Sequence, residues 1–249
     1  MQTILVINSK GGSGKTTLTT NLASYFVNKG HKTTILDYDP QGSSLQWLKV
    51  RPPHQPEIHG ANAAPSKKRA HLRSISMAVP ENTEYLVIDA PAGAEGILLQ
   101  EMVRKSNFIL IPVAPSAIDI HATTAFIKQL LLVGNIRSNK IKTAIVANKV
   151  RNTTPVYEPL EQFLNSLKLP FLTKLSDADN YIFAAEQGLG VYEMDEYNTG
   201  KECDELKPVI DWLSGKEQQP TLPATNESNF SFIDTITLNI HQDSLKGSR

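Results

Sequence analysis

A stretch rich in glycine and lysine near the start of the chain, SKGGSGKTT (Ser9–Thr17), is well suited to bind phosphate. Glycines lack the Cβ atom that would keep backbone N–H groups away from phosphate oxygens. The stretch lies between an apolar run and an amphipathic segment, which is the strand–loop–helix context of a P-loop. In that context Lys15 is expected to reach the outer phosphates of a nucleotide, and the hydroxyl of Thr16 is expected to bind Mg²⁺.

An acidic residue that ends an apolar run is the second feature with a chemical role. In YLVIDAPAG (Tyr85–Gly93), the apolar residues predict a buried strand that carries Asp89 to the carboxyl edge of a sheet. A carboxylate at that edge can hold Mg²⁺ directly or through water.

The elements that would position these residues alternate between strand and helix. Short apolar runs of the kind that form buried parallel strands occur at Thr3–Asn8, Lys32–Asp39, Glu84–Pro91, Phe108–Pro115 and Lys142–Lys149. The amphipathic segments between them are long enough for helices, and two of these segments end at Gly30 and Gly134. This alternation predicts an α/β fold with a doubly wound, mainly parallel sheet flanked by helices.

Two segments interrupt the alternation. The stretch RPPHQPEIHGANAAP (Arg51–Pro65) is rich in Pro, His and Ala and is predicted to be a loop or an irregular excursion. From about Ser214 the chain is polar and contains Pro, which predicts a flexible tail over residues 214–249 after a single domain over residues 1–213. Within this tail the apolar patch SFIDTITLNI could add an edge strand, dock a partner or be a weakly ordered end.

The composition limits the classes of function. Of the 249 residues 40% are hydrophobic, which is enough for a domain with a sizeable core. Lys+Arg and Asp+Glu both number 25, so any affinity for nucleic acid would have to come from a local basic patch. The single cysteine excludes a disulfide framework and a self-contained zinc or iron–sulfur site. The chain shows no secretory signal and no apolar run near the ~20 residues that span a bilayer, so we expect a cytoplasmic protein.

The complete loop pattern, K-G-G-x-G-K-T-T, resembles the signature of the ParA/MinD family of partition and positioning ATPases, in which Ser9 replaces the first glycine of the general P-loop. The resemblance continues through ILDYDPQGSS, YLVIDAPAG, VANKV and AAEQGLGVYE, and it covers residues 1–213. It implies ATP and Mg²⁺ as cofactors and a homodimer bridged by ATP. It also implies a role for Lys10, the additional lysine at the start of the loop, which would cross the dimer interface and contact the nucleotide of the other subunit.

The resemblance further implies roles for individual residues. By position, Asp39 would orient or activate the water that attacks the γ-phosphate, and the alternative is that it only caps the turn before Pro40. Asp37 would lie near the metal, and Asn148 would contact the base. The predicted residues are catalytic Lys10, Lys15 and Asp39; ATP-binding Lys10, Gly11, Gly12, Ser13, Gly14, Lys15, Thr16, Thr17 and Asn148; and metal-binding Thr16, Asp37 and Asp89.

Several branches of the family share this loop, and other residues favour one branch. Nitrogenase-type iron proteins and Mrp-type cluster carriers need more cysteines than Cys203 alone. A MinD-like protein would end in a basic amphipathic helix that lies on the membrane, whereas the end of this chain has no basic cluster before Lys246. Membrane binding is therefore not expected, and the ParA-type branch without a helix-turn-helix is favoured.

The resemblance to the ParA-type branch implies a cycle of DNA binding and release. The ATP-bound dimer would bind nonspecific DNA over the nucleoid, and a ParB-like or adaptor protein on a cargo would stimulate slow, Mg-dependent hydrolysis. The cargo could be a plasmid, a chromosome region or a protein organelle such as a carboxysome. The densest basic run, SKKRAHLR, offers Lys67, Lys68 and Arg69 as DNA contacts, although such a run is usually only a solvated face.

Three alternatives stay open at this point. The protein could be a MinD-like membrane-associated positioning ATPase, or an ATP-gated assembly scaffold with little turnover. It could also be a metabolic ligase or phosphotransferase on the same fold, although the sequence shows no recognisable acceptor pocket.

Overall fold

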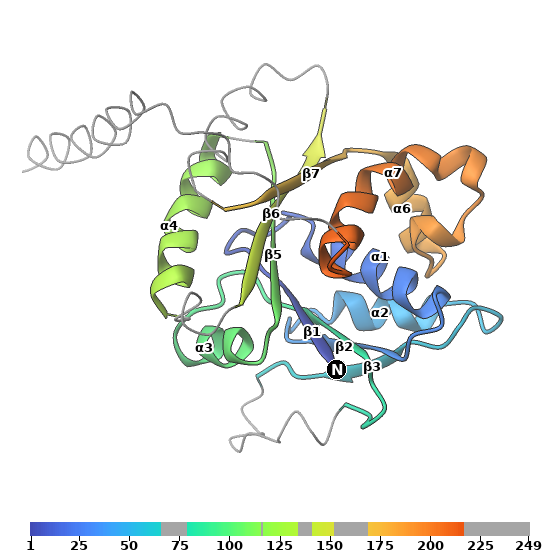
Figure 1. Ribbon diagram of the computed structural model, residues 1–249, viewed down its shortest axis with the longest axis horizontal. Helices are drawn as coiled ribbons and strands as arrows, with labels where there is room; N and C mark the ends of the chain where they lie inside the picture. Colours follow the sequence, from blue (N-terminus) through green and yellow to red (C-terminus); the bar gives the residue numbers. More distant parts are fainter. Residues whose placement is uncertain (66–78, 116, 134–140, 152–168, 217–249) are drawn as a thin grey trace, which may run out of the picture.

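Within the described residues of the computed structural model, which are 1–65, 79–115, 117–133, 141–151 and 169–216, seven strands form one sheet (Figure 1). The strands are β1 (Gln2–Val6), β2 (Thr33–Asp37), β3 (His59–Asn62), β4 (Tyr85–Asp89), β5 (Phe108–Val113), β6 (Lys142–Val150) and β7 (Phe171–Ser176). The helices are α1 (Lys15–Asn28), α2 (Ser43–Val50), α3 (Gly96–Arg104), α4 (Ala117–Val133), α6 (Asp179–Glu186) and α7 (Glu196–Leu213), with a 3₁₀ helix η2 (Val191–Glu193). The strand order is β3-β2-β4-β1-β5-β6-β7, and these strands pair in parallel.

Helices cover both faces of the sheet, so the fold is doubly wound (Figure 1). Because alternate residues of a strand point to opposite faces, Ile4 and Val6 of β1 belong to one core, and Leu5 and Ile7 belong to the other. All four side chains are fully buried. The first core is completed mainly by α1 and α7, and the second by α3 and α4. The α/β fold predicted from the sequence is confirmed.

The strand order brings three functional loops together at the carboxyl edge of the sheet. β1 lies next to β4, and β2 lies on the other side of β4. The register pairs Val6 with Asp89 and Asp37 with Asp89, so β1, β2 and β4 end side by side. In open parallel sheets ligands bind at this edge.

Two strands lie in segments for which the sequence predicted none. The segment predicted to be a loop or an irregular excursion contains β3, in which His59 pairs with Thr34 of β2. β7, with the sequence FLTKLS, pairs with β6 although most of its residues are only half-buried. Both strands are at the edges of the described sheet, where a strand does not need the continuous apolar run that marks a central one. The five strands predicted from apolar runs are confirmed.

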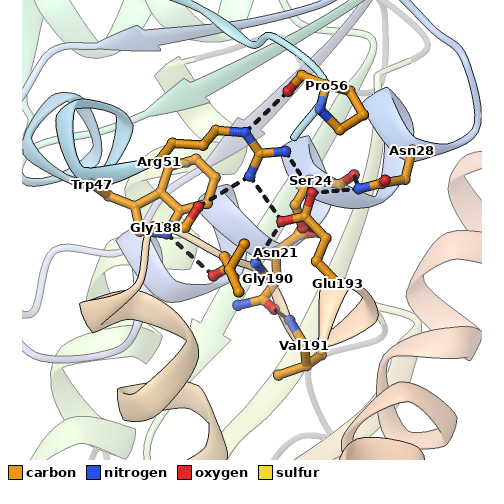
Figure 2. Close-up of polar contacts among 11 residues, drawn as sticks. Asn21, Ser24, Asn28, Trp47, Arg51, Pro56, Gly188, Gly190, Val191 and Glu193 are labelled. Carbon is orange, nitrogen blue, oxygen red and sulfur yellow. Dashed lines mark hydrogen bonds and ion pairs between the residues drawn. The ribbon is translucent and has the colours of Figure 1, made fainter. Parts of the chain in front are cut away.

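A buried ion pair joins the end of α2 to η2 (Figure 2). The side chains of Arg51 and Glu193 are 6% and 1% exposed, and Arg51 Nη1 donates to Glu193 Oε2 at 2.8 Å. The guanidinium group also donates to the carbonyls of Pro56 and Gly188, and it lies over the ring of Trp47. These partners offset the desolvation of the two charges, whereas removing either side chain would leave the other charge buried and unpaired.

The segment between α6 and η2 lies directly against α1 (Figure 2). The N–H of Val191 donates to Asn21 Oδ1 at 2.8 Å. A Cβ atom at Gly190 would lie 1.8 Å from Ser24 Oγ, so only glycine allows this approach. The contacts hold AAEQGLGVYE against the helix that follows the glycine-rich loop.

The carboxyl-terminal part of the chain is described only as far as residue 216. α7 ends at Leu213, and residues 217–249, which the sequence predicts to be a flexible tail, lie outside the described residues. The division of the chain at residue 213 therefore stays a prediction. In the part that the structure describes, none of the helices is both long and apolar enough to cross a membrane.

Candidate functional site

The loop between β1 and α1 turns through two glycines with a left-handed backbone. Gly12 has a φ of 76° and Gly14 a φ of 90°, a region that residues with a Cβ atom rarely adopt. Gly14 is the N-cap of α1, so the helix begins at Lys15 and its first N–H groups have no partner within the helix. An anion in this loop would meet these donors and the positive end of the helix dipole.

The ammonium group of Lys15 lies inside the loop. Its Nζ donates a hydrogen bond of 3.0 Å to the carbonyl of Lys10, and the side chain is buried. Burial lowers the pKa of Lys15, while the carboxylates of Asp89 and Asp39 act in the opposite direction. Because an ammonium group has three N–H donors, Lys15 can keep this bond and still donate to phosphate oxygens.

Asp89 and Thr16 form the part of the site that fits a divalent cation. Thr16 Oγ1 donates to Asp89 Oδ2 at 2.8 Å. Asp89 is 1% exposed, and its other oxygen, Oδ1, is buried without a hydrogen-bond partner among the described residues. An unpaired buried carboxylate oxygen is unfavourable, and a bound Mg²⁺ would satisfy it. The donor set therefore fits Mg²⁺ held by Asp89 and Thr16.

Burial changes the ionisation of Asp89. Desolvation raises its pKa from 3.8 to about 7, with the hydrogen bond from Thr16 opposing the rise and the charge of Asp37 adding to it. The folded protein therefore binds the proton of the Asp89 carboxyl group more tightly than the unfolded chain does. The stability that results is fully present below about pH 4 and is lost as the pH rises through 7.

We expect Asp89→Asn to remove this loss of stability, because asparagine carries no charge and can still accept the bond from Thr16. We compare the free energy of unfolding of the variant with that of the parent, both without nucleotide. The difference, variant minus parent, should be about 2–4 kcal/mol larger at pH 8 than at pH 4.5. Urea unfolding at the two pH values measures this difference. Mg·ATP should then stabilise the parent far more than the variant. An equal gain for both proteins would contradict metal binding by Asp89.

The two carboxylates that follow β2 have different surroundings. Asp37 is fully buried, its Oδ1 accepts from the N–H of Asp39 at 2.8 Å, and its Oδ2 accepts from Ser44 Oγ at 2.6 Å. Both oxygens of Asp37 thus hold the turn from β2 into α2, which favours Asp89 over Asp37 as the direct metal ligand. Asp39 is partly exposed, and its Oδ1 accepts from the N–H of Gln41 at 2.9 Å. The turn-capping bond considered for Asp39 is therefore present, and its role toward water stays a prediction.

Asn148, the predicted base contact, lies against the loop. Its Nδ2 donates to the carbonyl of Ser13 at 2.8 Å, and a Cβ atom at Gly14 would lie 1.8 Å from this Nδ2. The next residue, Lys149, has a φ of 57°, and the pairing of β6 with β7 is irregular at this point. The structure gives Asn148 a role in supporting the loop, and contact with a base stays a prediction.

The segment after Asp89 is attached to the start of the loop. The N–H of Gly93, which has a φ of 69°, donates to the carbonyl of Ser9 at 2.9 Å. Ser9 directly precedes Lys10. A change in this segment on ligand binding would therefore reach Lys10 through one hydrogen bond and one peptide unit.

The structure places the remaining predicted residues in two groups. Lys10 and Thr17 are partly exposed, Gly11 is exposed, and all three belong to the loop or to the first turn of α1. The predicted DNA contacts Lys67, Lys68 and Arg69 lie outside the described residues.

Asn8 also contacts the loop, although neither its type nor its spacing gives a signal in a single sequence. It is buried between β1 and the loop, and its side chain accepts from the N–H of Lys10. A lone asparagine after an apolar run has many ordinary explanations, so only the structure identifies this contact.

The model of one protein family, the CobQ/CobB/MinD/ParA nucleotide binding domain, matches residues 4–191. This match covers most of the chain and includes the loop, both carboxylate motifs and Asn148. The chain belongs to this family. The ParA/MinD proteins within it are P-loop ATPases, so the loop of this ParA/MinD protein is a nucleotide-binding loop of that kind.

Individual relatives agree with this membership. The protein is 27% identical over 213 residues to "Maintenance of carboxysome distribution protein A" of Halothiobacillus neapolitanus, a match of 84% of this chain and 94% of that protein. It is 29% identical over 131 residues to the chromosome-partitioning ATPase Soj of Thermus thermophilus, which is 39% of this chain and 53% of Soj.

Solved structures of relatives share the fold. The ATP complex of a McdA variant from Cyanothece superimposes with a TM-score of 0.66 at 14% identity, covering 89% of this chain and 99% of that one. MinD from Aquifex aeolicus superimposes with a TM-score of 0.64 at 19% identity, covering 88% and 99%. At such identities the similarity shows the fold alone.

Proposed function

We propose that this protein is an ATP-dependent dimerising switch that positions or segregates an intracellular cargo. The observation that carries the proposal is the buried oxygen of Asp89 that has no hydrogen-bond partner among the described residues. It lies beside Thr16 and Lys15 and suits Mg²⁺ and the phosphates of ATP. The match to a carboxysome-distribution protein over 84% of this chain supports a protein organelle such as a carboxysome as the cargo. A plasmid or a chromosome region is the alternative, in line with the shorter match to Soj.

Each residue of the loop has a distinct task in this proposal. Lys15 and the backbone N–H groups of residues 11–17 bind the phosphates. Thr16 and Asp89 would hold Mg²⁺, which would neutralise charge on the outer phosphates. Asp39 orients the attacking water, and Lys10 contacts the nucleotide of the partner protomer.

Hydrolysis separates the protomers. Water attacks the γ-phosphoryl group, and the products are ADP and phosphate. The γ-phosphoryl group that Lys15 of one protomer and Lys10 of the other would bind is then lost. A ParB-like or adaptor protein on the cargo would stimulate this step and so release the protein from DNA near the cargo. Repeated cycles would then position the cargo over the nucleoid.

We expect the ATP-bound dimer to bind nonspecific DNA with a strong dependence on salt. The chain has equal numbers of basic and acidic residues, so binding depends on a local patch that dimerisation doubles. If Lys67, Lys68 and Arg69 of each protomer contact phosphates, about six contacts form, and the affinity should fall roughly 1,000-fold between 50 and 200 mM salt. Fluorescence anisotropy of a labelled duplex, with ATP, with ADP and without nucleotide, measures this.

A charge-matched pair of variants tests the contacts. Replacing Lys67, Lys68 and Arg69 with alanine should abolish ATP-dependent binding. Replacing Lys105, Lys201 and Lys207 with alanine removes the same charge from residues that pair with acidic neighbours, and binding should persist. Absence of DNA binding in every nucleotide state would contradict the DNA part of the proposal.

Two further measurements separate the alternatives. If DNA binding fails, ATP-dependent binding to anionic lipid vesicles would favour a MinD-like membrane-associated ATPase. ATP-dependent binding to a cargo partner without any turnover would favour an assembly scaffold.

A further inference from the structure

We propose that Asn8 is a positioning residue for Lys10 and that it couples the glycine-rich loop to β5 and α4. The proposal rests on the role proposed above for Lys10 at the dimer interface. Asn8 lies between the end of β1 and the loop, and it is 1% exposed.

The carboxamide of Asn8 uses all of its hydrogen-bonding capacity within the protein. Nδ2 donates to the carbonyl of Pro112 at 2.7 Å and to Thr123 Oγ1 at 3.3 Å. Oδ1 accepts from the N–H of Lys10 at 3.3 Å and from Ser9 Oγ at 3.4 Å. The bond to Pro112 is short and anchors the group, while the other three are longer and individually weaker. An amide side chain has two N–H donors and two lone pairs, and all four are used in these bonds. Asn8 is therefore expected to act through the residues that it holds and not by contact with a ligand.

The surroundings of Asn8 select an amide in one orientation. The carbonyl of Pro112 can only accept, and the N–H of Lys10 can only donate. An aspartate would place a second oxygen against the carbonyl of Pro112, and an apolar residue would remove the bonds that Asn8 makes to both backbone groups. Asparagine is the side chain of this size that can donate to the carbonyl of Pro112 and accept from the N–H of Lys10.

The backbone of Lys10 is held from two directions. Asn8 holds its N–H, while its carbonyl accepts from Lys15 Nζ at 3.0 Å and from Ser13 Oγ at 3.3 Å. The ammonium group of Lys10 has to reach a phosphate across an interface, so its reach depends on where its own Cα atom lies. A displacement of ~1 Å at such a group can reduce its effect ~100-fold.

Thr123 extends this arrangement to α4. Its side chain is fully buried, and its hydroxyl accepts from the same Nδ2 that binds Pro112 of β5. A movement of α4 relative to β5 would stretch the bonds of Asn8 and shift Lys10. The position of α4 can therefore influence the contact that Lys10 makes in the dimer.

A matched pair of variants tests the coupling. Thr123→Val removes the hydroxyl that binds Asn8 and keeps the shape of the side chain. Thr143→Val makes the same exchange at a buried position in β6 whose hydroxyl has no hydrogen-bond partner among the described residues. Sedimentation velocity with ATP measures dimerisation, a fluorescent ATP analogue measures nucleotide affinity, and amide hydrogen exchange without nucleotide measures the stability of residues 9–12.

We expect Thr123→Val to weaken the dimer roughly 5-fold and to speed exchange in residues 9–12 by a similar factor, as for one lost hydrogen bond. Nucleotide affinity should stay within about 2-fold of the parent, Thr123→Ser should restore the parent values, and Thr143→Val should match the parent. Asn8→Ala should weaken the dimer further, yet the double variant with Lys10→Ala should be no weaker than Lys10→Ala alone, because Asn8 acts through Lys10.

Three results would overturn the proposal. The first is equal behaviour of Thr123→Val and Thr143→Val in dimerisation and exchange. The second is a parallel loss of nucleotide affinity, and the third is an additive effect of Asn8→Ala and Lys10→Ala. If the parent protein does not dimerise with ATP, the proposed function fails, and the exchange comparison still decides whether Thr123 and Asn8 hold the start of the loop.

Discussion

Replacing Lys10 with alanine should weaken the ATP-dependent dimer roughly 100-fold or more, while the affinity of one protomer for ATP changes less than about 3-fold. In a two-fold dimer the contact of Lys10 with a phosphate occurs twice. A hydrogen bond to a charged group contributes about 1.5–3 kcal/mol, and each 1.4 kcal/mol is about tenfold in affinity. Binding within one protomer relies on Lys15, whose Nζ lies inside the loop. The backbone bonds of Lys10 to Asn8 and Lys15 do not involve its side chain, so the variant can keep both of them.

Sedimentation velocity over a range of protein concentrations, with ATP and without nucleotide, measures this effect. Lys105→Ala is the control, since it removes a lysine that pairs with Glu101 on the same helix. If Lys10→Ala dimerises like the parent, Lys10 does not act across the interface. An equal loss in both variants would indicate a general effect of charge.

Replacing Asp39 with asparagine should slow ATP turnover roughly 100-fold or more and cause the ATP-bound dimer to accumulate. A positioned group that orients or deprotonates the attacking water contributes about 10²–10⁴ to a rate. Asparagine keeps an oxygen that can accept from the N–H of Gln41, so the turn after β2 is retained and only the charge is lost. Asp39→Ala removes both the accepting oxygen and the charge. It should show the same loss of turnover, and its free energy of unfolding should be lower than that of the parent by about 1 kcal/mol.

Phosphate release and the fraction of dimer, measured on the same samples, follow the two consequences. Asp211→Asn is the control, because Asp211 pairs with Lys207 on the exposed side of α7. Normal turnover in Asp39→Asn would show that this carboxylate only caps the turn. Loss of nucleotide binding in the same variant would place Asp39 in binding and not in hydrolysis.

The loop and the central strands could be predicted because their signals are local in the chain. Residues 9–17 are consecutive, and Gly12 and Gly14 have the left-handed backbone for which glycine is suited. Central strands are buried on both faces and so appear as apolar runs. The edge strands β3 and β7 lack such runs, since they are strands only because β2 and β6 lie beside them.

The roles of the two carboxylates that end buried strands could not be separated from the sequence. Asp37 and Asp89 both follow apolar runs, and the register places them opposite each other. Asp37 gives both oxygens to the turn into α2, whereas Asp89 keeps one oxygen without a partner among the described residues. The difference depends on Ser44 and Thr16, whose positions relative to each carboxylate follow from the packing of the sheet.

The sequence by itself determined the family, the α/β class and the position of the glycine-rich loop, because adjacent residues and apolar periodicity carry that information. Only the tertiary structure decided which polar atoms of the described residues are paired within the protein and which are not. Asn8 meets Thr123 across 115 positions of the chain, and Arg51 meets Glu193 across 142. Such pairs are selected by burial and hydrogen-bond geometry once the sheet has formed, and no pattern among neighbouring residues reports them.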